Sequence, residues 1–117
     1  MNVSVSQQPP YTIVKVGGRI DWEQARELDE LIRSLIDEGN YQLVFELDEI
    51  TFISSGGIGA LVYNLKTVKN YNGSMYLIAS SKYMNFIFET LKFHIIFEGN
   101  IFSSIQQFQK NLLDNQE

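Results

Sequence analysis

Apolar and polar residues follow two different periods along this chain. The stretch from Tyr11 to Val16 is mostly apolar and β-branched, which predicts a strand closed by Gly17-Gly18. A weaker alternation over residues 3 to 5, before Pro9-Pro10, favours a hairpin-like start. We therefore expect two strands at the beginning of the chain.

The clearest helix is expected after Asp21. Apolar residues recur there with the period of an amphipathic helix, at Ala25, Leu28, Leu31, Ile32, Leu35 and Ile36. Asp21 stands where an N-cap residue belongs, and Gly39-Asn40 follows the last apolar position, where glycine commonly ends a helix. Both ends of this helix are thus predicted from the sequence.

Strands and helices then alternate to the end of the chain. Short apolar runs predict strands at 42–47, 74–79 and 95–97. Apolar stripes of helical period predict helices at 58–68, 81–91 and 101–112. The order is ββαβαβαβα, with about five strands and four helices. It favours an α/β fold with a mixed central sheet, because crossover helices usually link parallel strands.

Length and composition indicate one domain. The chain has 117 residues, of which 44% are apolar and 20% are charged, which is enough apolar material for one core and far from the composition of disordered chains. We expect a single domain over residues 1–117, with a core at about 11–113 and flexible ends.

Charge and residue usage exclude several kinds of site. The net charge is -5 and the lysines are scattered, so no basic surface for nucleic acid is expected. Cysteine is absent and His94 is the only histidine, which removes thiol chemistry and the usual metal-ligand sets. No segment approaches the length of apolar sequence that a membrane span needs. We expect a cytoplasmic protein without membrane insertion, metal or cofactor.

The candidate functional segment lies between the strand at 42–47 and the helix at 58–68. Gly56, Gly57 and Gly59 follow Ser54-Ser55, although each glycine in a helix costs about 1 kcal/mol relative to alanine. Such glycines suit an unusual turn or the close approach of another backbone. A serine here would lie at a helix N-terminus, which favours an added phosphate. Serine is also a common N-cap, and the local chemistry leaves both interpretations open.

Four stretches together resemble a known family. They are Gly18-Arg-Ile-Asp21, Leu43-Val-Phe-Glu-Leu-Asp48, Ile50-Thr-Phe-Ile-Ser-Ser-Gly-Gly-Ile-Gly-Ala-Leu61 and Gly73-Ser-Met-Tyr-Leu77. Their order and spacing are similar to the STAS domain of bacterial anti-sigma factor antagonists. The resemblance runs from about Thr12 to Phe108 and implies a STAS-like fold.

The resemblance also implies a function. The chain would be a non-enzymatic binding switch in transcription regulation. It would bind an anti-sigma factor with serine kinase activity and lose that binding when phosphorylated at Ser55, with Ser54 as the alternative acceptor. A serine phosphatase would reverse the modification, and the chain would be a monomer or a weak dimer. The expected partner surface comprises Asp21, Ser54, Ser55, Gly56, Gly57, Ile58 and Gly59.

Three other interpretations stay open at this point. The chain could be a STAS subunit of a stressosome-type signalling complex or of a lipid-transport ATPase. In a different class, it could be a small nucleotide-binding α/β domain, although it lacks both G-x-x-x-x-G-K-[ST] and G-x-G-x-x-G. Acidic residues at 23, 27, 29 and 30 could suggest metal or acid–base chemistry. They spread around the expected helix, however, as the residues of a solvated helix face normally do.

Overall fold

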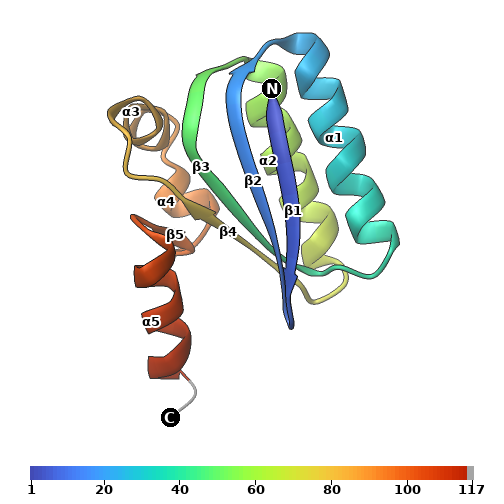
Figure 1. Cartoon of the computed structure of the whole chain (residues 1–117), viewed down its shortest axis with the longest axis vertical. Helices are drawn as coiled ribbons and strands as arrows, with labels where there is room; N and C mark the ends of the chain where they lie inside the picture. Colours follow the sequence, from blue (N-terminus) through green and yellow to red (C-terminus); the bar gives the residue numbers. More distant parts are fainter. Residues whose placement is uncertain (116–117) are drawn as a thin grey trace.

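A five-stranded sheet forms the centre of the computed structural model, which describes residues 1–115 (Figure 1). The strands are β1 (Asn2–Gln8), β2 (Tyr11–Ile20), β3 (Gln42–Ile53), β4 (Ser74–Ile78) and β5 (Ile101–Phe102). The helices are α1 (Trp22–Asp37), α2 (Ser55–Lys69), α3 (Lys82–Thr90), α4 (Phe93–Ile96) and α5 (Ile105–Asn115).

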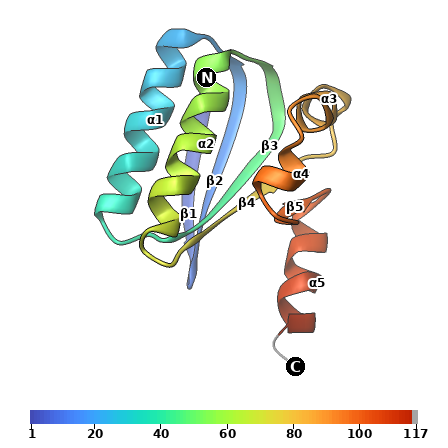
Figure 2. The ribbon, with the colours of Figure 1, turned by 180° about the vertical axis from the view of Figure 1, so that it is seen from behind.

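The sheet is mixed, as the sequence predicts. Its order is β1-β2-β3-β4-β5, with β1 antiparallel to β2 and every later pair parallel. Figures 1 and 2 show α1 and α2 side by side on one face of the sheet. The alternation of helices and strands therefore predicts both the parallel pairs and the crossover helices.

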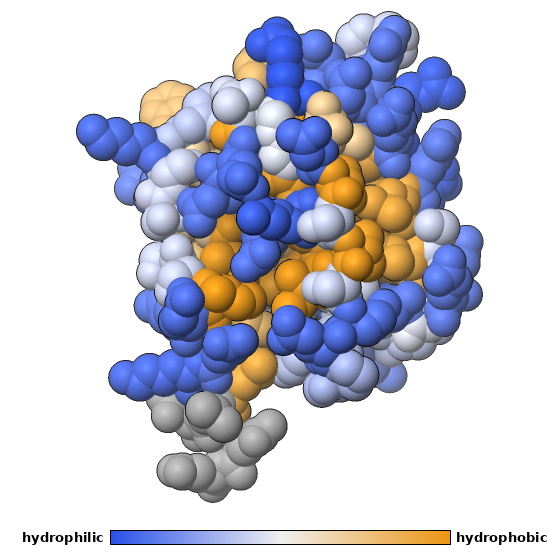
Figure 3. All heavy atoms as spheres, in the orientation of Figure 1, coloured by the Kyte–Doolittle hydropathy of each residue, from blue (hydrophilic) through white to orange (hydrophobic). Residues whose placement is uncertain are grey.

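Two hydrophobic cores lie on the two faces of the sheet. The larger core joins the inward stripes of α1 and α2 to alternate residues of the central strands, such as Val14, Phe45 and Leu77. The smaller core contains the intervening residues and an aromatic group around Phe108 of α5. Burial there raises the pKa of Tyr11, and the neighbouring Tyr76 adds to this effect. On the face of the sheet opposite α1 and α2, apolar surface is visible over the middle of the sheet, with hydrophilic side chains around it (Figure 3).

Strands β2 and β3, like β1, are longer than predicted. Strand β2 does not end at Gly17-Gly18 but continues to Ile20, with irregular pairing to β3 around these glycines. A Cβ on Gly17 would come within 2.9 Å of the Glu49 Cβ, so the glycine here permits close packing within the sheet instead of ending the strand. Strand β3 likewise continues beyond residue 47, to Ile53.

The prediction of a strand at 95–97 is wrong. Most of that run belongs to α4, and the last strand is the two-residue β5, which starts at Ile101. Helix α5 accordingly begins at Ile105, four residues later than expected. Left-handed backbone at Lys92, before α4, and at Glu98 and Gly99, after it, separates this helix from its neighbours. The prediction failed because a run of three apolar residues is too short to distinguish a strand from a helix. Residues 1–115 therefore contain one helix more than the sequence predicts.

The two ends differ from each other. All seven residues of β1 are exposed, so this strand joins the sheet while lying outside the hydrophobic cores, whereas Met1 before it packs against the larger core. At the other end, the second flexible end is expected beyond about residue 113, and its last two residues, 116 and 117, fall outside the described part. No helix within residues 1–115 has the length and apolar character needed to cross a bilayer.

Candidate functional site at the start of helix α2

Two strand-to-helix turns lie next to each other at one edge of the sheet. Strands β2 and β3 are parallel, and Ile20 pairs with Ile53 at their ends. The next residue of each strand, Asp21 or Ser54, is the N-cap of the following helix. The Ser54 N–H donates to the Ile20 carbonyl oxygen at 2.8 Å, which ties the two turns together. The sheet register thus brings together two residues that the sequence placed in one site.

The two serines of the turn have different environments. The Ser54 Oγ accepts a hydrogen bond from the Gly57 N–H at 3.3 Å, and the Ser54 carbonyl accepts from the Ile58 N–H at 3.0 Å. Ser54 is half-buried and caps the helix. Ser55 is the first residue of α2 and is exposed to solvent. Its hydroxyl is therefore the more accessible of the two.

The electrostatic setting of Ser55 favours an anion. The first N–H groups of a helix have no partner within the helix and carry the positive end of its macrodipole. The first turn of α2 contains no acidic residue, whereas Lys66 and Lys69 lie in its last turn. A phosphate on Ser55 would be stabilised by the local field of the helix.

The three glycines of α2 have three different surroundings. Gly57 is buried, and a Cβ on it would lie 2.7 Å from Ile53 Cγ1 and 3.1 Å from Ile20 Cγ2. A Cβ on Gly56 would lie 3.2 Å from the Ala25 Cβ of α1. A Cβ on Gly59 would meet no atom of the described residues within 4 Å. Gly57 is thus required for packing under the turn, while Gly59 leaves open surface.

A groove runs between α1 and α2 beside the serine turn. It has a volume of about 420 Å³, and its lining includes Gly56, Gly59 and two exposed aromatic side chains, Trp22 and Tyr63. Ile58 points elsewhere, because it is half-buried against the larger core. The surface next to Ser55 therefore combines exposed glycine backbone with aromatic side chains.

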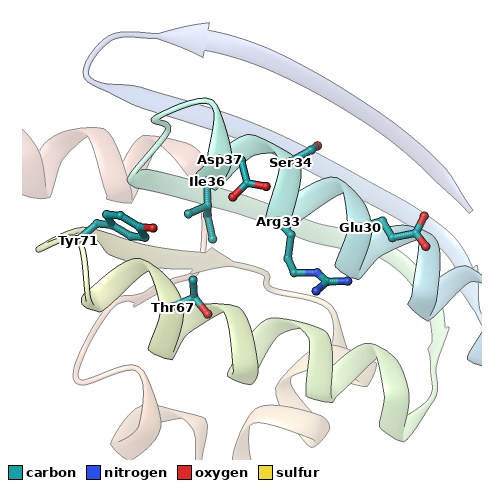
Figure 4. A pocket seen from close by; sticks show the side chains of 7 residues that line it. All are labelled: Glu30, Arg33, Ser34, Ile36, Asp37, Thr67 and Tyr71. Atoms are coloured by element: carbon teal, nitrogen blue, oxygen red, sulfur yellow. The ribbon is translucent and has the colours of Figure 1, made fainter.

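A second hollow lies farther along the seam between α1 and α2, near their C-terminal ends. Its volume is about 350 Å³, and Figure 4 shows the side chains of Thr67 from α2 and Tyr71 from the turn after it facing those of α1. Arg33 lines it and is paired with Asp29, with 3.2 Å between Nε and Oδ2. This hollow contains none of the residues that the sequence placed in the site.

Asp21 has local contacts of its own. Its backbone N–H donates to Gln24 Oε1 at 3.1 Å, and its Oδ2 lies 3.1 Å from Arg19 Nε. The Arg19 guanidinium carbon is 4.2 Å from the centroid of the Phe52 ring on the neighbouring strand. Arg19 is a neighbour of the site that is not among the residues predicted from the sequence. The signal that could have indicated Arg19 is its position on β2, which runs parallel to β3, two residues before the N-cap Asp21.

The phenylalanines of the C-terminal half and the single histidine are dispersed. Phe88, Phe93 and Phe97 are buried in the larger core, whereas Phe86 is exposed on α3 and His94 is exposed on α4. Among the residues described, no group of three acidic or histidine side chains is placed to hold a metal ion. The acidic residues noted in the sequence therefore form no candidate metal centre in this part of the chain.

Comparison with known families identifies the class of the protein. The STAS domain model matches residues 2–108, and the chain belongs to the STAS domain family. The fold class and the resemblance predicted from the sequence are thereby confirmed.

Three individual proteins show how similar the chain is to known members of this class. The chain is 26% identical over 89 residues to an anti-sigma-B factor antagonist of Staphylococcus aureus, covering 76% of this chain and 82% of the relative. Its fold is similar to SpoIIAA, the Bacillus cell fate determinant, in the phosphorylated form (TM-score 0.72, 13% identity, 99% of this chain and 100% of that one). It is also similar to an anti-sigma factor antagonist from Mycobacterium paratuberculosis (TM-score 0.79, 18% identity, 90% and 87%).

Proposed function

We propose that this protein is an anti-sigma factor antagonist whose binding is switched off by phosphorylation of Ser55. In the unphosphorylated state it binds an anti-sigma factor with serine kinase activity and so releases a sigma factor. The observation that carries the proposal is the division of roles in the turn: Ser54 caps α2, whereas Ser55 is exposed at the positive end of the helix. The names of the relatives support the same role.

The partner would dock on the surface around the turn. Asp21, Ser55, Gly56 and Gly59 supply its accessible part, and Trp22 extends it along α1. Ser54, Gly57 and Ile58 contribute by holding the helix start in place. A phosphate adds about -1.5 to -2 charges, and desolvating it against a docked partner opposes binding.

The switch on this proposal requires little change in fold. Because the helix N-terminus stabilises a phosphate locally, the modification alters the docking surface and leaves the sheet and helices in place. The chain itself supplies the acceptor hydroxyl, and the partner supplies the kinase activity and the nucleotide. A serine phosphatase would restore the binding-competent form.

Binding measurements on matched variants test this proposal. Calorimetric titration with the anti-sigma factor that co-purifies with the protein should show tight binding for the wild type and for Ser55→Ala. Ser55→Asp should bind at least about tenfold more weakly, because it places a charge on the docking surface. Its melting temperature should stay within a few degrees of the wild type, since an acidic residue is tolerated in the first turn of a helix. Equal binding by Ser55→Asp and the wild type would contradict the proposal.

A nucleotide titration separates the rival class of protein. A small nucleotide-binding domain would bind ATP or GTP by itself, and the isolated chain is expected to show no saturable binding of either. The Gly57 N–H, which a phosphate-binding loop would use, already donates to Ser54 Oγ. Saturable micromolar binding to the isolated chain would favour the rival class.

A further inference from the structure

Strand β3 extends beyond β4 on the way to the serine turn. Pairing between β3 and β4 ends at Glu46 and Ile78, whereas β3 continues beside β2 as far as Ile53. The last part of β3 therefore has a neighbouring strand on one side only. Backbone N–H and C=O groups on its other side need different partners.

The start of α3 contacts this part of β3 at two places, and one of the two contacts supplies a partner for a backbone group of β3. Asp48 Oδ1 accepts a hydrogen bond from the Ser81 N–H at 2.9 Å and a further one from the Ser80 N–H, which fixes the start of α3 against β3. One turn later, the Tyr83 hydroxyl oxygen accepts a hydrogen bond from the Ile53 N–H at 3.0 Å. The first turn of α3 is thus bound to β3 both at Asp48 and at the last residue of the strand.

The second of these contacts lies directly before the site. Ile53 precedes Ser54, whose N–H donates to Ile20 on the β2 side. The end of β3 is consequently held from both sides, by a strand carbonyl on one and by the Tyr83 hydroxyl on the other. Tyr83 itself is half-buried, and the adjacent Met84 is fully buried in the larger core, which gives the hydroxyl a rigid support.

We propose that Tyr83 is a positioning residue for Ser55. Its hydroxyl holds the last peptide group of β3 and thereby sets the direction in which α2 presents the serine to the kinase. This inference rests on the proposed function and adds a residue from a distant part of the chain to the same site. Without the hydroxyl, the Ile53 N–H loses its acceptor and the end of the strand opens more often, so that Ser55 spends less time in the geometry that phosphoryl transfer needs.

The substitution Tyr83→Phe tests the proposal because it removes the hydroxyl and keeps the ring. Tyr71→Phe is a matched control, since Tyr71 is an exposed residue beyond the far end of α2. Amide hydrogen exchange measured by NMR should be about tenfold faster at Ile53 in Tyr83→Phe and unchanged at Phe45 in the middle of the same strand. Tyr71→Phe should change neither amide.

Phosphorylation kinetics provide the readout that a purely structural role would leave unchanged. With the co-purifying anti-sigma factor and ATP, Tyr83→Phe should raise the KM for this chain about twofold and leave kcat unchanged, because a tenfold increase in opening lowers the fraction of competent turns by that amount when the wild-type turn is open about a tenth of the time. Unchanged exchange at Ile53 would overturn the proposal. So would faster exchange with an unchanged KM, since the bond would then only stabilise the strand end. If the wild type is not phosphorylated at all, the proposed function fails and the role of Tyr83 fails with it.

Discussion

Helices α1 and α2 begin at the same edge of the sheet, each separated from one of two neighbouring parallel strands by a single N-cap residue, yet their first turns have different compositions. Helix α1 has an aspartate N-cap, Glu23 in its first turn and a glutamine that bonds back to the N-cap. Helix α2 has a serine N-cap, no acidic residue in its first turn and glycines at its second, third and fifth positions. Both turns occupy equivalent places in the fold, so the fold alone does not explain the difference.

The first turn of α1 is composed for helix stability, whereas the first turn of α2 is composed for contact with another molecule. The first turn of α1 uses residue types that stabilise a helix start through capping and the macrodipole. The first turn of α2 leaves its macrodipole uncompensated and gives up helix propensity at Gly56 and Gly59, where packing is less restrictive than at Gly57. A helix start of this kind is suited to receiving a phosphate and a close-packed partner.

The largest effect on stability is expected from Gly57→Ala. The added methyl group would overlap with the Ile53 and Ile20 side chains, and overpacking of this kind costs about 1–3 kcal/mol. Urea unfolding should show a lower midpoint with an unchanged slope. A free energy of unfolding equal to that of the wild type would show that the turn is looser than the structure indicates.

A smaller effect is expected at the start of α1. Asp21→Ala removes the N-cap and should lower the free energy of unfolding by about 1 kcal/mol. Asp21→Asn keeps a capping oxygen and should retain most of this stability, while removing the charge from the partner surface. The two variants separate the capping role from the contact role when partner binding is measured beside unfolding. If Asp21→Asn binds the anti-sigma factor as the wild type does, Asp21 acts as a cap alone.

The smallest effect, with the opposite sign, is expected from Gly59→Ala. No described atom lies near the new methyl group, so helix propensity should stabilise the protein by about 0.5–1 kcal/mol. The same methyl group would protrude into the groove beside Trp22 and weaken binding of the anti-sigma factor. A variant that is more stable and binds equally well would remove Gly59 from the docking surface.

The sequence predicts those features that depend on residues close together in the sequence. The apolar stripe and the two end signals of α1 are all local, and the glycine-rich turn after β3 stands out without any knowledge of the fold. The length of β3 could not be predicted, because Asp48 and Glu49 interrupt its apolar run and its last part is stabilised by β2 and α3. The two-residue β5 is a strand only because β4 lies beside it.

The site was predicted in part for the same reason. Ser54, Ser55 and the glycines are adjacent in the sequence, and Asp21 was included through the family resemblance. Arg19 and Tyr83 reach the turn through the sheet register and through α3, respectively. Nothing in the local sequence relates Tyr83 to Ile53, which lies 30 residues earlier. Contacts of this kind become visible only in the folded chain.

The most direct test of the switch is to locate the phosphate. The wild type, Ser54→Ala and Ser55→Ala are each incubated with the co-purifying anti-sigma factor and ATP, and the modified residue is identified by mass spectrometry. We predict phosphate on Ser55 in the wild type and in Ser54→Ala, and none in Ser55→Ala, with loss of the complex wherever the phosphate is present. Phosphate on Ser54 alone, or a complex that persists after Ser55 is phosphorylated, would contradict the account.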